Sequence, residues 1–463
     1  MSLKPPPAAF DAQADIVIVG AGAAGLIAAL AAREAGAEVV LVERDPTPRG
    51  STALSAGLIP AAGTRFQAAR GIVDDAEAFA RDINAKSHGE ADPALVRLVA
   101  REAAPTVEWL ADRYGLPFSV VDDFDYPGHG ARRMHGLPTR SGAELMDRLH
   151  EAVERAGATL VGGALAVALY VDPDGRGRGV EIERPDGARE RIGARALVLA
   201  CNGYGGNPDL VARYIPEMRR ALYFGHPGNR GDALHWGEAL DARLAHLSAY
   251  QGHGSVAHPH GMLITWATIT EGGFQVNAEG KRFCDESRGY SEQARDVIAQ
   301  SGGLAWTIFD ERIAAVARQF EDFRQAEAAG AIIEAADVGE LAQRLKLPGA
   351  ALAATCNEVA SYKRGEGHDG FGRRFAGAPA LSAPFKGVKV TGALFHTQGG
   401  LVVDSKARVV LRDGGVAKTL FAAGGAAVGV SGSTASGYLS GNGLLTASVL
   451  GRIAGESAAG GRR

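Results

Sequence analysis

Two glycine-rich segments at opposite ends of the chain contain the residues best suited to hold a cofactor and act on a substrate. The segment GAGAAG, at residues 20–25, has the GxGxxG spacing that lets a backbone turn approach a pyrophosphate. The segment SGYLSGNGLL, at residues 436–445, resembles loops that cradle a phosphate or a ring, yet it carries a phenol, Tyr438, and a hydroxyl, Ser440. Such side chains in a glycine-rich loop raise the question of a role in catalysis.

The first segment predicts a dinucleotide site because each of its glycines has a separate task. Gly20 permits the turn, Gly22 admits the pyrophosphate, and Gly25 lets helix and strand pack closely. The phosphates then lie on free amides at the helix N-terminus. Glu43, at the end of the following strand, is placed to accept from a ribose hydroxyl and disfavours a 2′-phosphate. FAD and NAD share this signature, so the motif alone does not choose between them.

The elements that must position these segments follow from apolar periodicity and glycine punctuation. One βαβ unit is predicted from a strand at 15–19, a helix at 26–34 and a strand at 38–43. Later elements are predicted as helices at 75–114, 143–156, 310–329 and 444–459, an antiparallel sheet within 160–192, and a buried strand in ARALVLACNGYGGN at 194–207.

The predicted fold class is α/β, with a Rossmann-like nucleotide-binding domain built from both ends of the chain. Between about residues 250 and 386 the sequence pattern changes to short strands and polar, alanine-rich helices. After residue 386 the pattern of the N-terminal part returns. We therefore predict residues 1–252 and 387–463 as the nucleotide-binding domain and residues 253–386 as an inserted α+β cap.

Composition and charge exclude several classes of partner. The 463 residues carry a formal net charge of −4 and no long basic block, so we expect neither nucleic acid nor a membrane as partner. No apolar run reaches about 18 residues and no secretion signal is evident, so we expect a cytoplasmic protein. Cys201, Cys284 and Cys356 fit neither haem attachment nor an iron–sulfur cluster, so redox chemistry would require an organic cofactor.

Five further motifs resemble the FAD-dependent fumarate reductase and 3-ketosteroid dehydrogenase superfamily. They occur in order across nearly the whole chain: GSTALSAGLIPAAGT at 50–64, GGFQVNAEGKRFCDES at 272–287, HTQGGLVVD at 396–404, LFAAGG at 420–425, and SGYLSGNGLLTASVLGRIAG at 436–455. The resemblance implies non-covalent FAD, a mobile cap, and a substrate held between the cap and the flavin ring. Where the family often has a glutamate after AAG, this chain has Gly425.

The resemblance also implies a set of FAD-binding residues. The loop beside the pyrophosphate and flavin, and the amides at the start of the last helix that face the flavin pyrimidine oxygen, are its main parts. The residues predicted to bind the cofactor are Gly20, Gly22, Ala23, Ala24, Gly25, Glu43, Arg44, Ser51, Thr52, Leu54, Ser55, Ala56, Gly57, Ala200, Asn202, Gly203, Gly424, Asn442, Leu444 and Leu445.

The catalytic positions of the family depart from the fumarate pattern in this chain. The positions of the proton-donating and substrate-clamping arginines fall on Tyr290 and Tyr438, as in the ketosteroid dehydrogenases, one branch of which has the Tyr-x-Ser pattern seen in Tyr438 and Ser440. A phenol suits a ketone, whose oxygen gains negative charge only as the enol forms. We expect Tyr438, with an amide of the loop such as that of Gly441, to polarise the carbonyl. Tyr290, assisted by Ser440, would take the α-proton, although the two phenols could exchange roles.

Several charged or imidazole side chains have weaker assignments. Arg288 is expected near the substrate, where its charge would lower the pKa of Tyr290, and His396 matches a histidine that binds carboxylate in the fumarate branch. Arg132, Arg133 and His135 could meet an acidic substrate. The spacing of His253, His258 and His260 fits no familiar zinc site, so no metal is expected.

The sequence therefore predicts an FAD-dependent oxidoreductase that desaturates a cyclic or steroid-like ketone at the α,β position, by α-proton abstraction and hydride transfer to flavin N5. The alternative within enzymes is a reductase of an α,β-unsaturated carboxylate, of the fumarate or urocanate kind. An alternative of another class is a flavin-binding protein without redox turnover. The electron donor or acceptor is not specified by the sequence.

Overall fold

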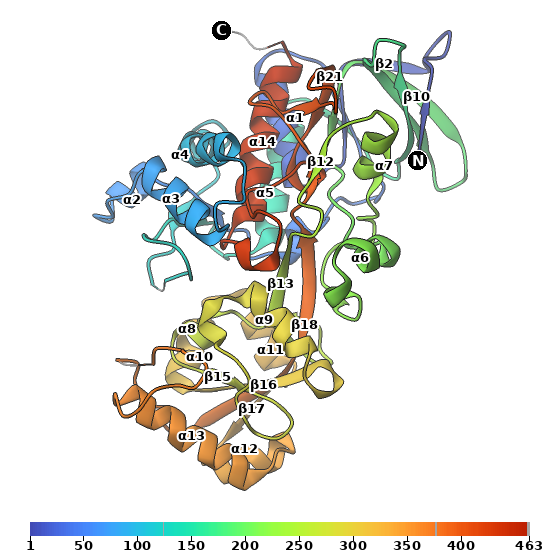
Figure 1. Ribbon diagram of the computed structural model, residues 1–463. Helices are drawn as coiled ribbons and strands as arrows, with labels where there is room; N and C mark the ends of the chain where they lie inside the picture. Colours follow the sequence, from blue (N-terminus) through green and yellow to red (C-terminus); the bar gives the residue numbers. More distant parts are fainter. Residues whose placement is uncertain (124, 376, 461–463) are drawn as a thin grey trace.

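The computed structural model describes residues 1–123, 125–375 and 377–460. Residues 461–463, the end of the predicted second domain segment, lie outside the described residues. Figure 1 shows two lobes, with a cap of helices and strands below a larger α/β domain that contains both ends of the chain. The predicted fold class, a Rossmann-like domain from both chain ends with an inserted cap, is confirmed.

The large domain is built on a mixed sheet with parallel strands at its centre. Strands β2, β3 and β7 run parallel in that order, β10 lies parallel to β2 on its other side, and β21 also pairs parallel with β10. The strands of this sheet are β1 (Ser2–Lys4), β2 (Ala12–Val19), β3 (Val39–Val42), β7 (Thr159–Val161), β8 (Leu165–Val171), β9 (Gly177–Glu183), β10 (Arg189–Leu199), β20 (Arg408–Val410) and β21 (Val416–Ala422).

Two helices from opposite ends of the sequence pack tightly beside this sheet (Figure 1). A Cβ added to Gly455 or Gly451 of α14 would lie 2.1 or 2.6 Å from a backbone oxygen of α1, so only glycine permits this approach. The contact places the first turn of α1 beside the middle of α14. The helices of this domain are α1 (Ala23–Glu34), α2 (Arg65–Ala68), α3 (Ala76–Lys86), α4 (Pro93–Tyr114), α5 (Gly142–Arg155), α6 (Pro208–Tyr214), α7 (Asp232–Ala239) and α14 (Asn442–Ala458).

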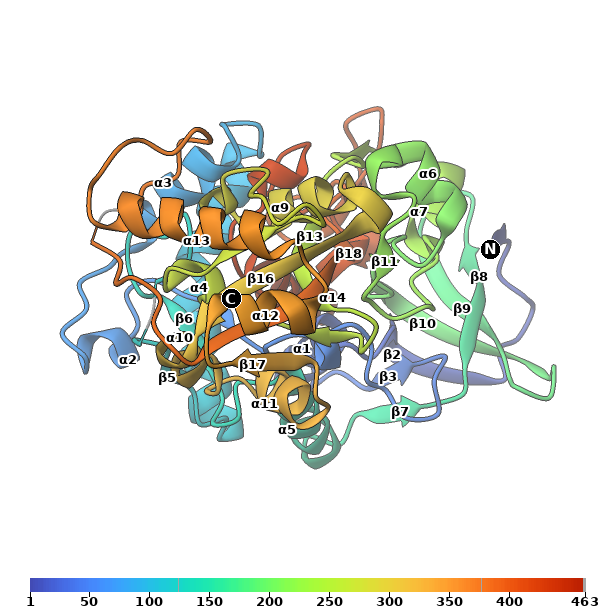
Figure 2. The ribbon, with the colours of Figure 1, turned by 90° about the horizontal axis from the view of Figure 1, so that it is seen from below.

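The cap contains a second, mostly antiparallel sheet covered by helices (Figure 2). Its strands are β11 (Leu222–Tyr223), β13 (Tyr250–Ala257), β14 (Met262–Leu263), β15 (Phe274–Val276), β16 (Leu304–Asp310), β17 (Ile332–Ala335) and β18 (Phe385–Thr397). Its helices are α8 (Ala267–Thr270), α9 (Tyr290–Ile298), α10 (Glu311–Ala317), α11 (Glu321–Ala328), α12 (Val338–Leu345) and α13 (Gly349–Lys363). Two small sheets complete the fold: β4 (Ile59–Pro60), β5 (Ser119–Val120) and β6 (Met134–Gly136), and β12 (Leu244–Ala245) with β19 (Gly400–Leu401).

The paired strands β13 and β18 connect the two lobes (Figure 1). Near the cap end, residues 385–391 of β18 pair with β16, and near the other end Thr397 pairs with Tyr250 at the start of β13. The predicted boundaries before residue 253 and after residue 386 therefore fall within continuous strands rather than in linkers.

Two predicted helices are each divided in the structure. The segment predicted as a helix at 75–114 forms α3 and α4, because Gly89 and His88 take positive φ angles and Asp92 caps a new helix that begins at Pro93. The segment predicted at 310–329 forms α10 and α11, separated at Phe320, which has an extended backbone. Both interruptions are turns that alanine-rich periodicity does not reveal.

Candidate active site

Two cavities adjoin one another, one within the large domain and the other where the lobes meet. One is lined by the glycine turn before α1, the end of β3 and the β10 turn, and the other by residues from both lobes. Ser51, Thr52 and Asn202 line both cavities, so they mark the junction between them. The first matches the predicted nucleotide site, and the second is placed to hold a ring and a substrate.

The nucleotide cavity has features that fit FAD. Gly20 has a φ of +103°, and a Cβ there would lie 2.5 Å from the oxygen of Ala200. A Cβ on Gly25 would lie 1.9 Å from the oxygen of Gly20, so the predicted tasks of the turn and close-packing glycines match the geometry. Trp236 lines this cavity, and its indole N–H is buried and has no partner among the described residues. A buried donor of this kind is normally satisfied, so a bound ligand would complete the site.

Most residues predicted to bind the cofactor line one of these cavities. They are Gly20, Gly22, Glu43, Arg44, Ser51, Thr52, Leu54, Ser55, Ala56, Gly57, Ala200, Asn202, Gly424 and Leu444. The predicted residues Ala23, Ala24, Gly25, Gly203, Asn442 and Leu445 do not line either cavity. They are buried behind the cavity walls as packing or hydrogen-bonding residues; for example, the N–H of Ala23 donates to Thr52 Oγ1 at 3.2 Å.

The glycine at position 425 is explained by its neighbour across the cavity. Asn202 has a φ of +64°, and its side-chain oxygen would lie 2.1 Å from a Cβ at position 425. A larger residue at 425 and Asn202 in this conformation therefore exclude one another. Gly425 thus leaves room for the side chain of Asn202.

The substrate cavity brings together the two predicted catalytic phenols. Tyr290 begins α9 of the cap, and Tyr438 precedes α14 of the large domain, with 6.1 Å between their ring centroids. Ser440, Gly441 and His396 line the same cavity. The N–H of Gly443 donates to the oxygen of Tyr438 at 3.4 Å. Sequence reasoning thus identified the residues that the two lobes bring together.

Burial raises the pKa of Tyr290, and this differs from the expectation that its neighbours lower it. Hydrogen bonds from Ser440, Tyr438 and the Gly441 amide act in the opposite direction, because they favour the phenolate. Burial also raises the pKa of Tyr438 well above its usual value, and the hydrogen bond to Tyr290 raises it further. Both phenols are therefore neutral near pH 7.

Arg288, which is predicted to lie near the substrate, is not among the residues that line the substrate cavity. Its guanidinium points to Asp296, with Nη2 and Oδ2 2.7 Å apart, and about half of its side chain is exposed. Arg288 lies in the short helix before Tyr290, but it does not line the substrate cavity. Arg132 and Arg133 are also outside this cavity: Arg132 pairs with Asp125 and Arg133 with Asp74.

Neutral hydrogen bonds hold the wall that carries Tyr438. Asn442 Nδ2 donates to Ser431 Oγ at 3.1 Å, and Ser431 Oγ donates to Gln398 Oε1 at 2.8 Å. Gln398 Nε2 lies 3.2 Å from Nδ1 of His396, whose pKa burial lowers to about 4. His396 is consequently neutral near pH 7 and cannot supply charge to the cavity.

A histidine that sequence reasoning missed supports the same loop from outside. His129 Nε2 lies 3.0 Å from the carbonyl oxygen of Ser440, which cannot donate, so the imidazole donates. Its Nδ1 faces Arg133, whose buried guanidinium pairs with Asp74 at 2.9 Å and Asp82 at 2.5 Å. None of the family motifs includes the loop that carries His129, so the sequence does not indicate that this residue contacts the loop with Tyr438.

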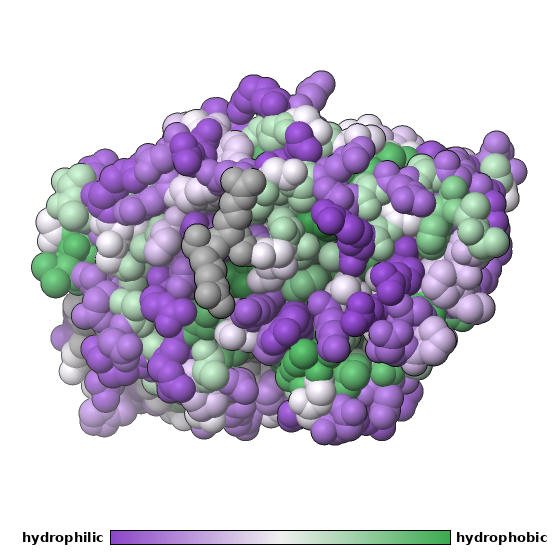
Figure 3. All heavy atoms as spheres, turned by 90° about the horizontal axis from the view of Figure 1, so that it is seen from above, coloured by the Kyte–Doolittle hydropathy of each residue, from purple (hydrophilic) through white to green (hydrophobic). Residues whose placement is uncertain are grey.

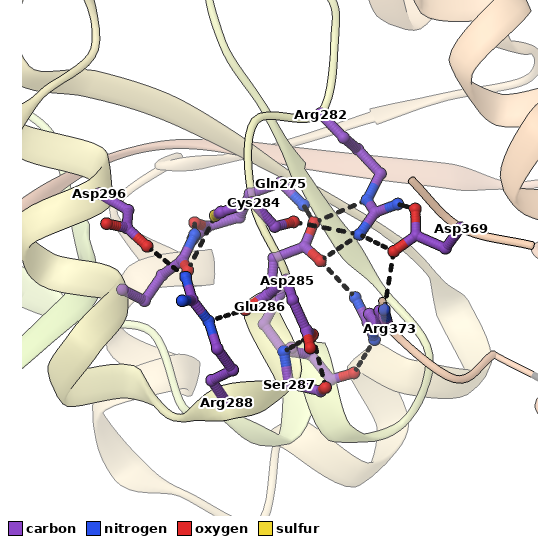
Figure 4. Close-up of polar contacts among 12 residues, drawn as sticks. Gln275, Arg282, Cys284, Asp285, Glu286, Ser287, Arg288, Asp296, Asp369 and Arg373 are labelled. Atoms are coloured by element: carbon purple, nitrogen blue, oxygen red, sulfur yellow. Dashed lines mark hydrogen bonds and ion pairs between the residues drawn. The ribbon is translucent and has the colours of Figure 1, made fainter. Parts of the chain in front are cut away.

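A buried cluster of charges holds the wall that carries Tyr290 (Figure 4). Glu286 lies between two guanidinium groups, accepting from Arg282 at 2.7 Å and from Arg373 at 3.1 Å. Asp369 accepts from Arg282 at 2.5 Å, and all four side chains are at most 5% exposed. The cluster ties the loop after α13 to the turn that leads into Tyr290.

An aromatic set extends from Tyr290 along the cavity. His253 stacks on Tyr290 with 4.8 Å between centroids and on Phe395 with 5.3 Å, and Phe395 stacks on Phe224. Burial lowers the pKa of His253 to about 3, so it is a neutral ring at pH 7. Tyr126 and Trp266 also line the cavity. Among the described residues, no group of three His, Cys, Asp or Glu side chains could hold a metal ion.

The outer face of the large domain opposite the cap is mostly hydrophilic, with hydrophobic residues in scattered groups (Figure 3). Within the described part of the chain, every helix is too short or too polar to cross a bilayer.

Comparison with known proteins agrees with this architecture. A model of the FAD binding domain family matches residues 15–444, so the chain belongs to this family. It is similar to a probable fumarate reductase, Ifc3, of Shewanella frigidimarina, with 31% identity over 96% of this chain and 74% of that protein.

Two solved structures show the fold of relatives. An open flavocytochrome c3 fumarate reductase matches with a TM-score of 0.82 and 29% identity, covering 98% of this chain and 79% of that one. A 3-ketosteroid-Δ4-(5α)-dehydrogenase from Rhodococcus jostii RHA1 matches with a TM-score of 0.75 and 24% identity over 98% of each chain, which is a likeness of fold. The predicted superfamily and FAD are thereby confirmed: the protein is an FAD-dependent oxidoreductase.

Proposed function

We propose that this oxidoreductase interconverts a cyclic ketone and its α,β-enone. The observation that carries the proposal is a substrate cavity with two adjacent phenols and, among the described residues that line it, no arginine or lysine. A carboxylate substrate needs a cationic or multiple-donor partner when it leaves water, whereas a ketone needs only hydrogen bonds.

The paired phenols can act on two neighbouring groups of a ketone, the carbonyl oxygen and the α-hydrogen, in the same reaction step. The carbonyl oxygen and the α-hydrogen are attached to adjacent carbon atoms, so the groups acting on them must lie side by side. Tyr438 has a proton to donate, and the amides of Gly441 and Gly443 lie at its oxygen. We assign to these groups the polarisation of the ketone oxygen, where negative charge develops.

Tyr290 is assigned the α-proton. The neighbouring Ser440, Tyr438 and Gly441 amide each act to lower its pKa, which stabilises the phenolate that takes a proton. Bound FAD would supply the two-electron acceptor for the hydride that leaves the β-carbon. In the opposite direction the high pKa of Tyr290 makes its neutral form the proton donor to the α-carbon.

Reduction of an α,β-unsaturated carboxylate is the second candidate. It is favoured by the 31% identity to a probable fumarate reductase and by the presence of His396 in the cavity. The neutral state of His396 and the ion pairs that engage Arg132 and Arg133 elsewhere weigh against it.

The experiment is anaerobic bleaching of the FAD-loaded protein. Saturated cyclohexanones and 3-ketosteroids are added in parallel with succinate and related diacids, and flavin absorbance is followed. We expect bleaching by at least one ketone and by none of the acids. Bleaching by acids alone would reject the ketone proposal in favour of the second candidate, and no bleaching by any compound would favour a non-catalytic flavoprotein.

A further inference from the structure

Among the described residues that line the substrate cavity, Asp322 alone has a charged side chain. The described residues that line this cavity include no other Asp, Glu, Lys or Arg. Asp322 lies in the first turn of α11 in the cap, two residues after Phe320, which also lines the cavity. The cap therefore presents a carboxylate to a space that is otherwise aromatic, apolar or neutral.

The carboxylate of Asp322 has no hydrogen-bond or ion-pair partner among the residues that the structure describes. Burial raises its pKa from 3.8 to about 6, and the neighbouring charge of Glu321 adds to the rise. A partly buried carboxylate without a partner costs stability, so its presence in a cleft indicates a function.

Helix capping does not account for Asp322. The N-cap position of α11 is Phe320, and no side chain caps the helix there. The neighbouring carboxylate, Glu321, faces outward and pairs with Arg324 and Gln325 within the helix. Asp322 is thus the member of the acidic pair that faces the cavity.

Asp322 lies away from the catalytic phenols. Asp322 belongs to α11, whereas Tyr290 begins α9 and Tyr438 precedes α14. Helix α11 packs beside β14, whose Leu263 lines the cavity near Phe224 and Phe395. The carboxylate therefore lines the cavity from the side of α11 and β14, and not from the starts of α9 and α14 that carry the phenols.

We propose that Asp322 selects the substrate by accepting a hydrogen bond from a donor group, such as a hydroxyl, at the end remote from the reacting ketone. The same charge repels substrates that carry a carboxylate there. This inference rests on the proposed function, since the ketone fixes which end of the substrate is remote. It narrows the substrate class to cyclic ketones with a distal hydrogen-bond donor.

The test compares ligands that differ only in the remote group. Cyclohexanones and decalones that carry a remote hydroxyl, methoxy or carboxylate group are titrated into the FAD-loaded protein, and binding is followed by the flavin absorbance change. Wild type is compared with Asp322→Asn, Asp322→Leu and the matched control Glu321→Gln. Binding is measured without turnover, so a failure here is separate from a failure of the bleaching experiment.

We expect wild type and Glu321→Gln to bind the hydroxyl ligand about tenfold more tightly than the methoxy ligand, as for a hydrogen bond to a charged group. Asp322→Leu should lose this preference, and Asp322→Asn should bind the carboxylate ligand about tenfold more tightly than wild type does. Equal binding of hydroxyl and methoxy ligands by wild type, or no binding of the hydroxyl ligands, would overturn the inference. Survival of the preference in Asp322→Leu would overturn it as well, even if ketones bleach the flavin.

Discussion

The two walls of the substrate cavity are held in place by different chemistry. Tyr438 lies on a wall braced by neutral hydrogen bonds through Asn442, Ser431 and Gln398. Tyr290 lies on a wall braced by buried charges, with Glu286 between two guanidinium groups (Figure 4). Removing one partner of a buried neutral hydrogen bond costs about 1–3 kcal/mol, whereas removing one partner of a buried ion pair costs about 3–5 kcal/mol. The cap wall is therefore expected to be the more sensitive of the two.

The largest expected effect comes from breaking the cap wall. In Glu286→Gln the guanidinium groups of Arg282 and Arg373 keep only Asp369 as a buried counter-charge. We expect the free energy of unfolding of the cap to fall by about 3–5 kcal/mol, measured by urea unfolding with tryptophan fluorescence. The control is Arg288→Gln, which removes an exposed ion pair and should cost about 0.5 kcal/mol or less. Equal stability of the two variants would contradict this account of the wall.

The next effect separates the two phenols by their pH dependence. Burial raises the pKa of Tyr290, so its phenolate is rare at neutral pH and increases as the pH rises. The rate of flavin reduction by a ketone should therefore rise about tenfold per pH unit between about pH 7 and 9 in wild type. Tyr438→Phe should be about a hundredfold slower at every pH and keep this slope, whereas Tyr290→Phe should be slow with a flat profile. Stopped-flow absorbance measures both, and parallel profiles for the two variants would remove the distinction between donor and base.

A smaller effect is expected when the brace behind Ser440 is removed. His129→Leu deletes the donor to the Ser440 carbonyl, so the loop with Tyr438 is less well positioned, and kcat should fall about tenfold with KM little changed. His129→Gln restores an N–H donor and should recover most of the rate. Steady-state kinetics with the same ketone measure both, and equal rates for the two variants would mean that the hydrogen bond does not position the loop.

The smallest expected effect concerns the charge of Asp322. Its pKa of about 6 in the folded protein exceeds its ordinary value of 3.8, so the folded state binds this proton more tightly than the unfolded state. That contribution to stability is present at low pH and is lost as the pH rises through about 6. Asp322→Asn should therefore increase stability at pH 7 by about 1 kcal/mol, a value discounted for partial exposure, with no gain at pH 4. Thermal unfolding at the two pH values measures this, and a loss of stability at pH 7 would show that the carboxylate has a structural partner.

The large-domain wall could be predicted from the sequence because its parts are local. Glycine spacing and apolar runs predict the turn at Gly20 and the start of α14, and the family motifs cover Tyr438 and Ser440. Those features depend on residues within a few positions of one another. The agreement with the observed cavity lining follows from this locality.

The cap wall and the outer braces could not be predicted in the same way. Glu286 meets Arg373 across more than eighty positions, and His129 meets the Ser440 carbonyl across more than three hundred. The sequence shows each charged residue but not its partner, so Arg288 was assigned to the substrate although Asp296 engages it. The raised pKa of Tyr290 also depends on burial by the other lobe, which a local pattern does not report.

The continuity of β18 has a consequence for exchanging caps between related enzymes. The strand runs from the cap sheet at Phe385 to Thr397, and it carries Phe395 and His396 into the substrate cavity. A chimaera joined at residue 386 would combine one parent's cap with the other parent's cavity lining on a single strand. A junction after Thr397 would transfer these residues together with the cap. Such a chimaera should have the substrate preference of the parent that supplies the cap and β18.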